Sequence, residues 1–231
     1  MILAAGRGER MRPLTDHTPK PLLEVGGKAL IVWHIEHLKK AGFNEIVINH
    51  AHLGAQIEAY LGNGSAWNLN IQYSPEITAL ETAGGIANAM HLLTGSNLTE
   101  SEHEAFLVVN GDIFTDLDFA PLASALQTPN LAHLVMVNNP PQHAEGDFSL
   151  NVSHHHKLAI DGLNKLTFSG VGVYHPDLFK DIKPGQAANL APLLKTAMTA
   201  GLVSGQHYQG VWHDIGTPQR LNELDAILRI L

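Results

Sequence analysis

The chain has 231 residues, 45% of them hydrophobic, which fits one large domain with a substantial core or, as the alternative, two small domains. Its 22 acidic and 14 basic residues give a formal net charge of −8, which argues against broad binding to nucleic acid, since that binding depends on positive charge. The absence of cysteine excludes disulfides and cysteine-based metal sites. No apolar run reaches the roughly 18 residues of a membrane span and no signal peptide pattern occurs, so we expect a soluble, cytoplasmic protein that binds no membrane.

The first predicted element is a short buried strand, residues 1–5, that leads into a glycine-rich loop. Gly6 and Gly8 allow backbone N–H groups to approach an anion closely, because no side chain intervenes. The same region contains four cationic side chains, namely Arg7, Arg10, Arg12 and Lys20. Backbone donors combined with cations suit a triphosphate, whose charge must be met at many oxygens. The alternative is a surface turn with solvated charges, which the clustered arginines and the Pro-Lys-Pro of residues 19–21 disfavour.

Alternating helices and strands follow the loop. The spacing of apolar residues predicts helices over residues 29–41 and 53–61, with Gly42 at the C-terminal cap of the first. Strands are predicted at residues 45–49 and 70–74. This order indicates parallel pairing, with a ligand expected beyond the carboxyl ends of the strands.

The later elements are predicted in the same way. Thr82 is a candidate N-cap for a helix over residues 86–93, and Thr217 caps the last helix. Strands are predicted at residues 106–112, 131–138 and 166–174, and helices at residues 176–179, 190–200 and 219–231. Three consecutive histidines, 154–156, would point to opposite faces of a strand, so we interpret them as a solvated loop rather than a metal site.

Two aspartates are candidates for cation binding. Asp112 ends a buried predicted strand, where a carboxylate can hold a cation over a phosphate, although a turn or cap aspartate fits the same position. Asp214 lies much later in the chain, and a buried carboxylate there would be costly without a partner. Both are useful to a common site only if the fold brings their strands together.

The opening motif is similar to that of a known family. Residues 3–15 have the pattern Leu-Ala-Ala-Gly-x-Gly-x-Arg-x-x-Pro-Leu-Thr, and residues 19–22 are Pro-Lys-Pro-Leu, which resembles the sugar-phosphate nucleotidyltransferases. The resemblance implies an α/β, Rossmann-like nucleotide-diphospho-sugar transferase fold with a mostly parallel central sheet flanked by helices. It further implies one nucleotidyltransferase domain over residues 1–231, with a nucleotide-binding half at about 1–110, a sugar-binding half at about 111–231 and no appended β-helix domain.

The same resemblance implies the site residues. The nucleotide-binding set is Ala5, Gly6, Gly8, Glu9, Arg10, Lys20, Glu81, Gly84 and Gly85, and the catalytic residues are Arg10 and Lys20. The sugar-binding set is Asn110, Gly146, Asp147 and Ser169, and the expected Mg²⁺ ligands are Asp112 and Asp214. Whether Glu76 or Glu81 reads the nucleotide is open. Because two close carboxylates repel when no metal is bound, we expect Asp→Asn at either metal position to raise the melting temperature of the apo protein.

Within the family, five motifs are most similar to those of the N-acetylmuramate α-1-phosphate uridylyltransferases of peptidoglycan recycling; these are residues 8–14, 80–86, 146–148, 166–170 and 190–194. The similarity implies Mg²⁺-dependent nucleotidyl transfer from UTP to N-acetylmuramate 1-phosphate, which gives UDP-N-acetylmuramate and pyrophosphate, with no obligate protein partner. One alternative is the same chemistry on another sugar 1-phosphate or base, such as mannose 1-phosphate and GTP. The other is a nucleotide-sugar sensor without catalytic activity.

Overall fold

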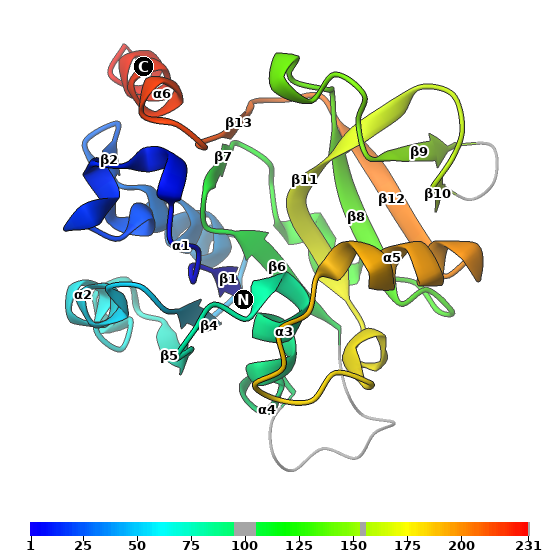
Figure 1. Cartoon of the computed structure of the whole chain (residues 1–231), viewed down its shortest axis with the longest axis horizontal. Coiled ribbons are helices and arrows are strands. Elements are labelled where there is room, and N and C mark those ends of the chain that lie inside the picture. Colours follow the sequence, from blue (N-terminus) through cyan, green and yellow to red (C-terminus); the bar gives the residue numbers. More distant parts are fainter. Residues whose placement is uncertain (95–104, 153–155, 231) are drawn as a thin grey trace. The chain divides into compact units, whose positions relative to one another are not determined.

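The computed structural model describes residues 1–94, 105–152 and 156–230, which form two compact units that alternate along the chain (Figure 1). Unit 1 comprises Met1–Leu80, Val109–Ala120 and Val211–Leu231, and unit 2 comprises Glu81–Val108 and Pro121–Gly210. No helix in the described ranges has both the length and the apolar character that crossing a membrane requires.

Unit 1 contains a parallel sheet with the strand order β5-β4-β1-β6. Its strands are β1 (Ile2–Leu3), β4 (Glu45–His50), β5 (Asn70–Pro75) and the last residues of β6 (Phe106–Asn110). All residues of β4 after the first are buried, as an apolar parallel strand covered on both faces requires. The predicted parallel order is thus confirmed for this part of the chain.

The helices of unit 1 are α1 (Leu30–Lys40), α2 (Gly54–Leu61) and α6 (Pro218–Leu228), with a hairpin of β2 (Glu24–Val25) and β3 (Lys28–Ala29) before α1. Gly42 follows α1 with φ 91°, and the N–H of Phe43 donates to the carbonyl of Leu38 at 3.0 Å, which is a Schellman cap. The Thr217 hydroxyl accepts the N–H of Arg220 and caps α6. Both predicted caps are confirmed.

One hydrophobic cluster joins segments of unit 1 that are distant in sequence. Its buried members are Met11, Leu23, Val25, Leu30, Phe114, Ile215, Leu221 and Leu224, with Trp33 and Leu228 packed against them. The Trp33 ring meets Phe114 edge-on, with 5.3 Å between ring centroids, and its indole N–H donates to the Val25 carbonyl at 3.0 Å. Because burying one such side chain contributes about 1.5–3 kcal/mol, this cluster is a main support of unit 1.

Unit 2 contains a mixed sheet that closes on itself. Its strands are β8 (Ala132–Val137), β9 (Phe148–Asn151), β10 (Lys157–Ala159), β11 (Lys165–Tyr174) and β12 (Val203–Tyr208). Strands β8 and β12 pair in parallel, whereas β10 with β12, β9 with β10, and β11 with β8 and β9 pair antiparallel, so that the order β11-β8-β12-β10-β9 returns to β11. The expectation of a mostly parallel sheet is therefore wrong for unit 2, where β11 pairs antiparallel with β8 and β9, and where the short connection between β9 and β10 favours an antiparallel hairpin.

The helices of unit 2 are α3 (Glu81–Asn88), α4 (Met90–Leu93) and α5 (Leu190–Thr199). The prediction of one helix over 86–93 with Thr82 as N-cap is wrong, because α3 begins at Glu81 and a separate short helix follows it. A carbonyl replaces the side-chain cap: the N–H groups of Ala83 and Gly84 donate to the Ala188 oxygen at 2.9 and 3.0 Å, and so satisfy donors that a helix start leaves open.

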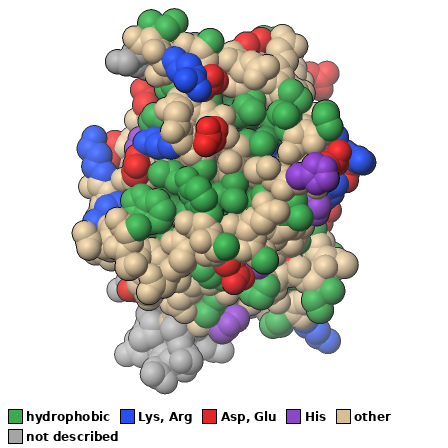
Figure 2. Space-filling view, turned by 90° about the vertical axis from the view of Figure 1, so that its left-hand side faces the viewer, with side chains coloured by type: hydrophobic (Ala, Val, Ile, Leu, Met, Phe, Trp, Pro, Cys, Tyr) green, Lys and Arg blue, Asp and Glu red, His purple; other side chains and the backbone are tan. Residues whose placement is uncertain are grey.

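Charged side chains of both signs are dispersed over the face shown in Figure 2. Surface ion pairs join residues four positions apart, for example Arg12 with Asp16 and Arg229 with Asp225, each at 2.7 Å. Exposed pairs of this kind contribute about 0–1 kcal/mol. The ionisable groups that matter for the energetics of this protein are therefore the buried ones.

His34 is one of these groups, and it generates a prediction about pH. It lies on α1 with 1% of its surface exposed, its ring is hydrogen-bonded to the backbone of Ile113, and burial lowers its pKa to about 4. The unfolded chain binds a proton at His34 below about pH 6.5, whereas the folded chain does not until about pH 4. The contribution of the neutral His34 ring to the free energy of unfolding is therefore fully present above pH 6.5. It decreases as the pH is lowered, and about 2 kcal/mol is lost at pH 5. Denaturant titrations at pH 7 and pH 5 measure how much the free energy of unfolding falls between these two pH values. This fall should be smaller in His34→Gln than in the wild-type protein by about 2 kcal/mol. An equal fall in the two proteins would contradict the assignment.

Candidate active site

The glycine-rich loop follows β1 and is braced from within. Gly8 has φ 68° and ψ 40°, a left-handed conformation, and a Cβ atom there would lie 3.0 Å from the Thr15 methyl carbon. The Thr15 hydroxyl donates to the Gly8 carbonyl at 2.9 Å. Around Gly6, a Cβ atom would have no neighbour within 4 Å, which leaves space beside the backbone for a ligand. Ala5 lies just before Gly6, and Glu9 begins the short 3-10 helix η1 (Glu9–Met11) with an exposed side chain.

The three arginines of the loop differ in their partners. Arg7 and Arg12 both approach Asp16, with nitrogen–oxygen distances of 3.5 and 2.7 Å. Arg10 is exposed and forms no ion pair with a carboxylate in the described part of the chain. Arg10 is thus the arginine of this loop whose charge is available to an anionic ligand.

Lys20 is a buried ammonium group held by a carboxylate. It lies in the 3-10 helix η3 (Lys20–Leu22) between Pro19 and Pro21, and only 7% of the residue is exposed. Its Nζ donates to Oδ2 of Asp112 at 2.8 Å. A buried cation requires such a partner, because burial of an unpaired charge is very costly. The Asp112 side chain keeps 42% of its surface exposed, so it can also meet a ligand.

Antiparallel pairing brings Asp112 and Asp214 onto neighbouring strands. Strand β7 (Ile113–Thr115) pairs with β13 (Trp212–Asp214), and Asp214 lies opposite Ile113. The N–H of Ile215 donates to the Asp112 carbonyl at 2.9 Å. The two aspartates that motif analysis selected are thus joined by a backbone ladder within unit 1.

Asp214 has a cation partner that the sequence analysis missed. Nη1 of Arg220 contacts Oδ2 of Asp214 and lies 3.3 Å from the Asp214 carbonyl oxygen. A Cβ atom on Gly216 would lie 3.1 Å from Arg220 Nη1, 3.2 Å from Arg10 Nη2 and 3.2 Å from Asp214 Oδ1, so these groups gather around that glycine. The available signal was a cation in the first turn of a helix, a position that the helix dipole disfavours unless an anion lies nearby.

A second glycine fixes Asp112 beside the first strand. Leu3 of β1 is in register with Asn110, and the N–H of Gly111 donates to the Leu3 carbonyl at 2.8 Å. A Cβ atom on Gly111 would lie 2.6 Å from that same oxygen, which excludes any side chain there. Asn110 is half-buried, and Asp112 follows directly on this close approach.

A buried polar chain links three strand ends of unit 1. The N–H of Ala4 donates to Asn49 Oδ1 at 2.9 Å, and Asn49 Nδ2 donates to Glu76 Oε1 at 2.7 Å. The other carboxylate oxygen of Glu76 accepts the N–H of Leu80 at 2.8 Å, and Glu76 is only 7% exposed. Both oxygens of Glu76 therefore position the backbone, and Asn49 is a second positioning residue that the sequence analysis missed.

The remaining nucleotide candidates lie in unit 2. Glu81 is exposed, has φ 61° and begins α3. A Cβ atom on Gly84 would lie 2.3 Å from the Gln186 carbonyl oxygen, so Gly84 is required by close packing of the backbone. Gly85 is buried within α3.

The sugar candidates of unit 2 have internal partners. Asp147 Oδ2 accepts the N–H of Phe168 at 2.8 Å, and its Oδ1 lies 3.1 Å from Nε2 of His143. Gly146 precedes it with φ 65°, and Ser169 is 2% exposed, with its Oγ accepting the N–H of Val171 at 3.2 Å. Of the histidine triplet, residues 154 and 155 lie outside the described residues.

The model of a protein family described as "Nucleotidyl transferase" matches residues 1–229 of the chain. An N-acetylmuramate alpha-1-phosphate uridylyltransferase of Neisseria meningitidis serogroup B is 55% identical over 98% of this chain and 96% of its own length. A protein of the same description from Caulobacter vibrioides is 31% identical over 95% of this chain and 92% of its own. Among solved structures, a Bacillus anthracis protein assigned as a glucose-1-phosphate thymidylyltransferase, in complex with sucrose, has a TM-score of 0.82, with 21% identity, 100% of this chain covered and 94% of that chain. This last likeness shows the fold, a mixed α/β architecture.

The ion pairs of Asp112 with Lys20 and of Asp214 with Arg220 change the expected effect of Asp112→Asn on the stability of the apo protein. Because Asp112 neutralises the buried Lys20, its replacement leaves that ammonium without an anion, and we expect the apo protein to lose about 1–2 kcal/mol of stability rather than to gain it. Denaturant unfolding without metal or nucleotide measures the change. The double variant Lys20→Met/Asp112→Asn is the control, since it removes both charges and should recover part of the loss. An unchanged or raised melting temperature in Asp112→Asn would contradict this account.

The contacts of Glu76 and Glu81 predict that the same substitution destabilises the protein at the first position and has little effect at the second. In Glu76→Gln an amide nitrogen must face either the Asn49 amide or the Leu80 N–H, both of which are donors, and we expect a loss of about 1–3 kcal/mol. Glu81→Gln, on an exposed side chain, should change stability by less than about 0.5 kcal/mol. Parallel urea titrations of the two variants measure this, and equal stabilities would show that the buried chain does not position the backbone.

Proposed function

Since the chain belongs to the nucleotidyl transferase family, we propose that it transfers a uridylyl group from UTP to N-acetylmuramate α-1-phosphate, with UDP-N-acetylmuramate and pyrophosphate as products. The observation that carries this proposal is the high identity to the Neisseria relative over almost the whole of both chains. The sugar phosphate is a metabolite of peptidoglycan recycling and UTP is a nucleotide of the cytoplasm, so we assign the reaction to the cytoplasm.

The reaction exchanges one phosphoanhydride bond for another. An oxygen of the sugar phosphate attacks the α-phosphorus of UTP, a new phosphorus–oxygen bond forms, and the bond to the β-phosphate oxygen breaks as pyrophosphate leaves. A phosphate monoester is already anionic at neutral pH, so no side chain has to remove a proton. Catalysis then consists of alignment of the reactants and stabilisation of negative charge.

The residues of unit 1 suit that task. Lys20 and Arg10 would neutralise the triphosphate and the leaving pyrophosphate, while the backbone from Ala5 to Glu9, with its open space at Gly6, would approach the phosphates closely. The stiffness of Lys20 supports its role, because two flanking prolines and an ion pair fix where its ammonium points.

The donor set around Asp112 and Asp214 fits a magnesium ion. Mg²⁺ takes one or two carboxylates and completes its octahedron with phosphate oxygens and water, and the two aspartates supply hard oxygen ligands on adjacent strands. These residues would hold the ion, which when bound offsets charge on the phosphates. Lys20 and Arg220 occupy the same carboxylates in the structure, so they keep each aspartate oriented before the ion binds.

Substrate recognition is assigned residue by residue. Glu76 is only 7% exposed and both its oxygens accept hydrogen bonds, so we assign contact with the nucleoside to the exposed Glu81 and close approach to Gly85, whereas the space beside Gly84 is filled by the Gln186 carbonyl. The contacts to the sugar are assigned to Asn110, Gly146, Asp147 and Ser169. The parallel sheet of unit 1 is assigned as the Rossmann-like part of the fold.

A substrate panel and one lysine pair test the proposal. Pyrophosphate release should be fastest with UTP and N-acetylmuramate 1-phosphate, and slower with GTP and mannose 1-phosphate. Lys20→Ala should lower kcat by about 100-fold or more, since it removes a charge that stabilises the transition state. Lys40→Ala, on the exposed last turn of α1, is the matched control and should keep full activity. Preference for the guanosine substrates would overturn the substrate assignment, and no turnover with any pair would support a sensor instead.

A further inference from the structure

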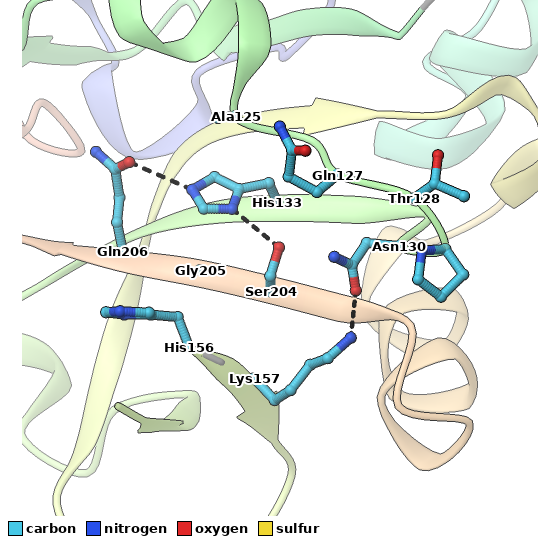
Figure 3. A pocket seen from close by; sticks show the side chains of 11 residues that line it. Ala125, Gln127, Thr128, Asn130, His133, His156, Lys157, Ser204, Gly205 and Gln206 are labelled. Carbon is cyan, nitrogen blue, oxygen red and sulfur yellow. Dashed lines mark hydrogen bonds between the residues drawn. The ribbon is translucent and has the colours of Figure 1, made fainter. Parts of the chain in front are cut away.

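A recess in unit 2 is lined by residues that the proposed reaction does not use (Figure 3). It has a volume of about 610 Å³ and is bounded by the segment before β8 and by the beginnings of β8, β10 and β12. Its polar side chains come from four segments and include Gln127, Asn130, His133, Lys157, Ser204 and Gln206. Side chains of such separate origin converge on one space only because the closed sheet brings their strands together.

The floor of the recess is a fixed hydrogen-bonded chain. His133 is 9% exposed, its Nδ1 lies 2.9 Å from the Ser204 hydroxyl, and its Nε2 lies 3.3 Å from Oε1 of Gln206 (Figure 3). Oε1 can only accept, so Nε2 carries the proton and Nδ1 accepts from Ser204. This arrangement turns the carbonyl of the Gln206 amide toward His133 and leaves its NH₂ group to donate to a ligand.

The charge of the recess is opposite to that of the chain. No Asp or Glu is among the residues that line it, although the chain has 22 acidic residues and a formal charge of −8. Lys157 projects one positive charge there, and its hydrogen bonds go to neutral oxygens, Oδ1 of Asn130 and the carbonyl of Gly201. An ammonium group whose partners among the described residues are neutral oxygens retains its attraction for an anion, because these oxygens do not compensate its charge.

We propose that this recess binds a phosphorylated sugar at a second site, separate from the residues of unit 1 that are assigned to the triphosphate. The ammonium of Lys157 would bind the phosphate, and the amide NH₂ of Gln206, which lies at the other end of the recess in Figure 3, would donate to a hydroxyl group of the sugar. Gln127 and Asn130 supply amide groups, and Thr128 supplies a hydroxyl, all of which suit the hydroxyl groups of a sugar. The volume is within the range of small-molecule sites.

The test uses the full chain without nucleotide or metal and follows amide NMR signals during titration with inorganic phosphate and with α-glucose 1-phosphate, at constant ionic strength. We expect saturable shifts at Gly205, Gln206 and the side-chain amides of Gln127 and Asn130. Glucose 1-phosphate should bind about tenfold more tightly than phosphate, because hydrogen bonds to the sugar add to the contacts of the phosphate. Equal affinities would overturn the sugar part of the assignment.

Two variants and a control make the result specific. Gln206→Glu keeps an acceptor for His133 and places a carboxylate in the recess, and Lys157→Met removes the ammonium; each should weaken binding at least about tenfold. Lys165→Met is the matched control, because Lys165 lies in the same unit but outside the lining and pairs with Asp161 at 3.9 Å. Shifts that do not saturate, that chloride reproduces or that persist in Gln206→Glu would overturn the proposal. Loss of this site would leave the uridylyltransferase activity unaffected, so the two proposals fail separately.

Discussion

Two carboxylates on neighbouring strands, each paired with its own cation, are the electrostatic constraint on which unit 1 depends. Lys20 can be buried only because Asp112 neutralises it, and Arg220 can occupy the first turn of α6 only because Asp214 lies beside it. The antiparallel pairing of β7 with β13 joins the two pairs. The aspartates therefore do not face one another as unpaired like charges, and a nucleotide with its cation would exchange partners with groups that are already charged and oriented.

The apolar packing of unit 1 places these groups with little freedom. Met11 from the glycine-rich loop, Phe114 from β7, Ile215 after β13 and Leu221 from α6 share one buried cluster. Each of these residues is a few positions from a charged group of the candidate site. A change that loosens the cluster would thus displace several site residues together, which is why core substitutions far from the phosphates are expected to affect turnover as well as stability.

Local signals in the sequence were sufficient to predict most elements, whereas the two aspartates were selected through their resemblance to motifs of a known family. Glycine at the end of α1 and threonine before α6 act through bonds that span a few residues, so their caps could be predicted. The partners of Lys20 and Asp214 were not predicted from residue types alone, because Lys20 and Asp112 are separated by 92 positions and only the fold decides which charges meet.

The mixed pairing in unit 2 was missed for a related reason. The alternation of strands and helices in the first eighty residues does not continue, and apolar strand patterns do not report the direction of the neighbouring strand. Glu76 shows most clearly what the sequence alone cannot predict. Its carboxylate is a candidate nucleotide contact by residue type, but in the fold it accepts hydrogen bonds from the Asn49 amide and the Leu80 N–H.

The alternation of the two units along the chain has a consequence for biosynthesis. Unit 1 needs Met1–Leu80, a short middle segment and residues from Val211 onward, whereas Pro121–Gly210 of unit 2 is continuous. On a translating ribosome the loop and α1 emerge early, yet Ile215, Leu221 and Leu224, which cover their apolar face, emerge last. The nascent N-terminal segment must therefore wait with an uncovered hydrophobic surface while unit 2 is made, a condition under which chaperones bind. The segment of unit 1 that follows unit 2 along the chain thus completes the unit that holds the glycine-rich loop.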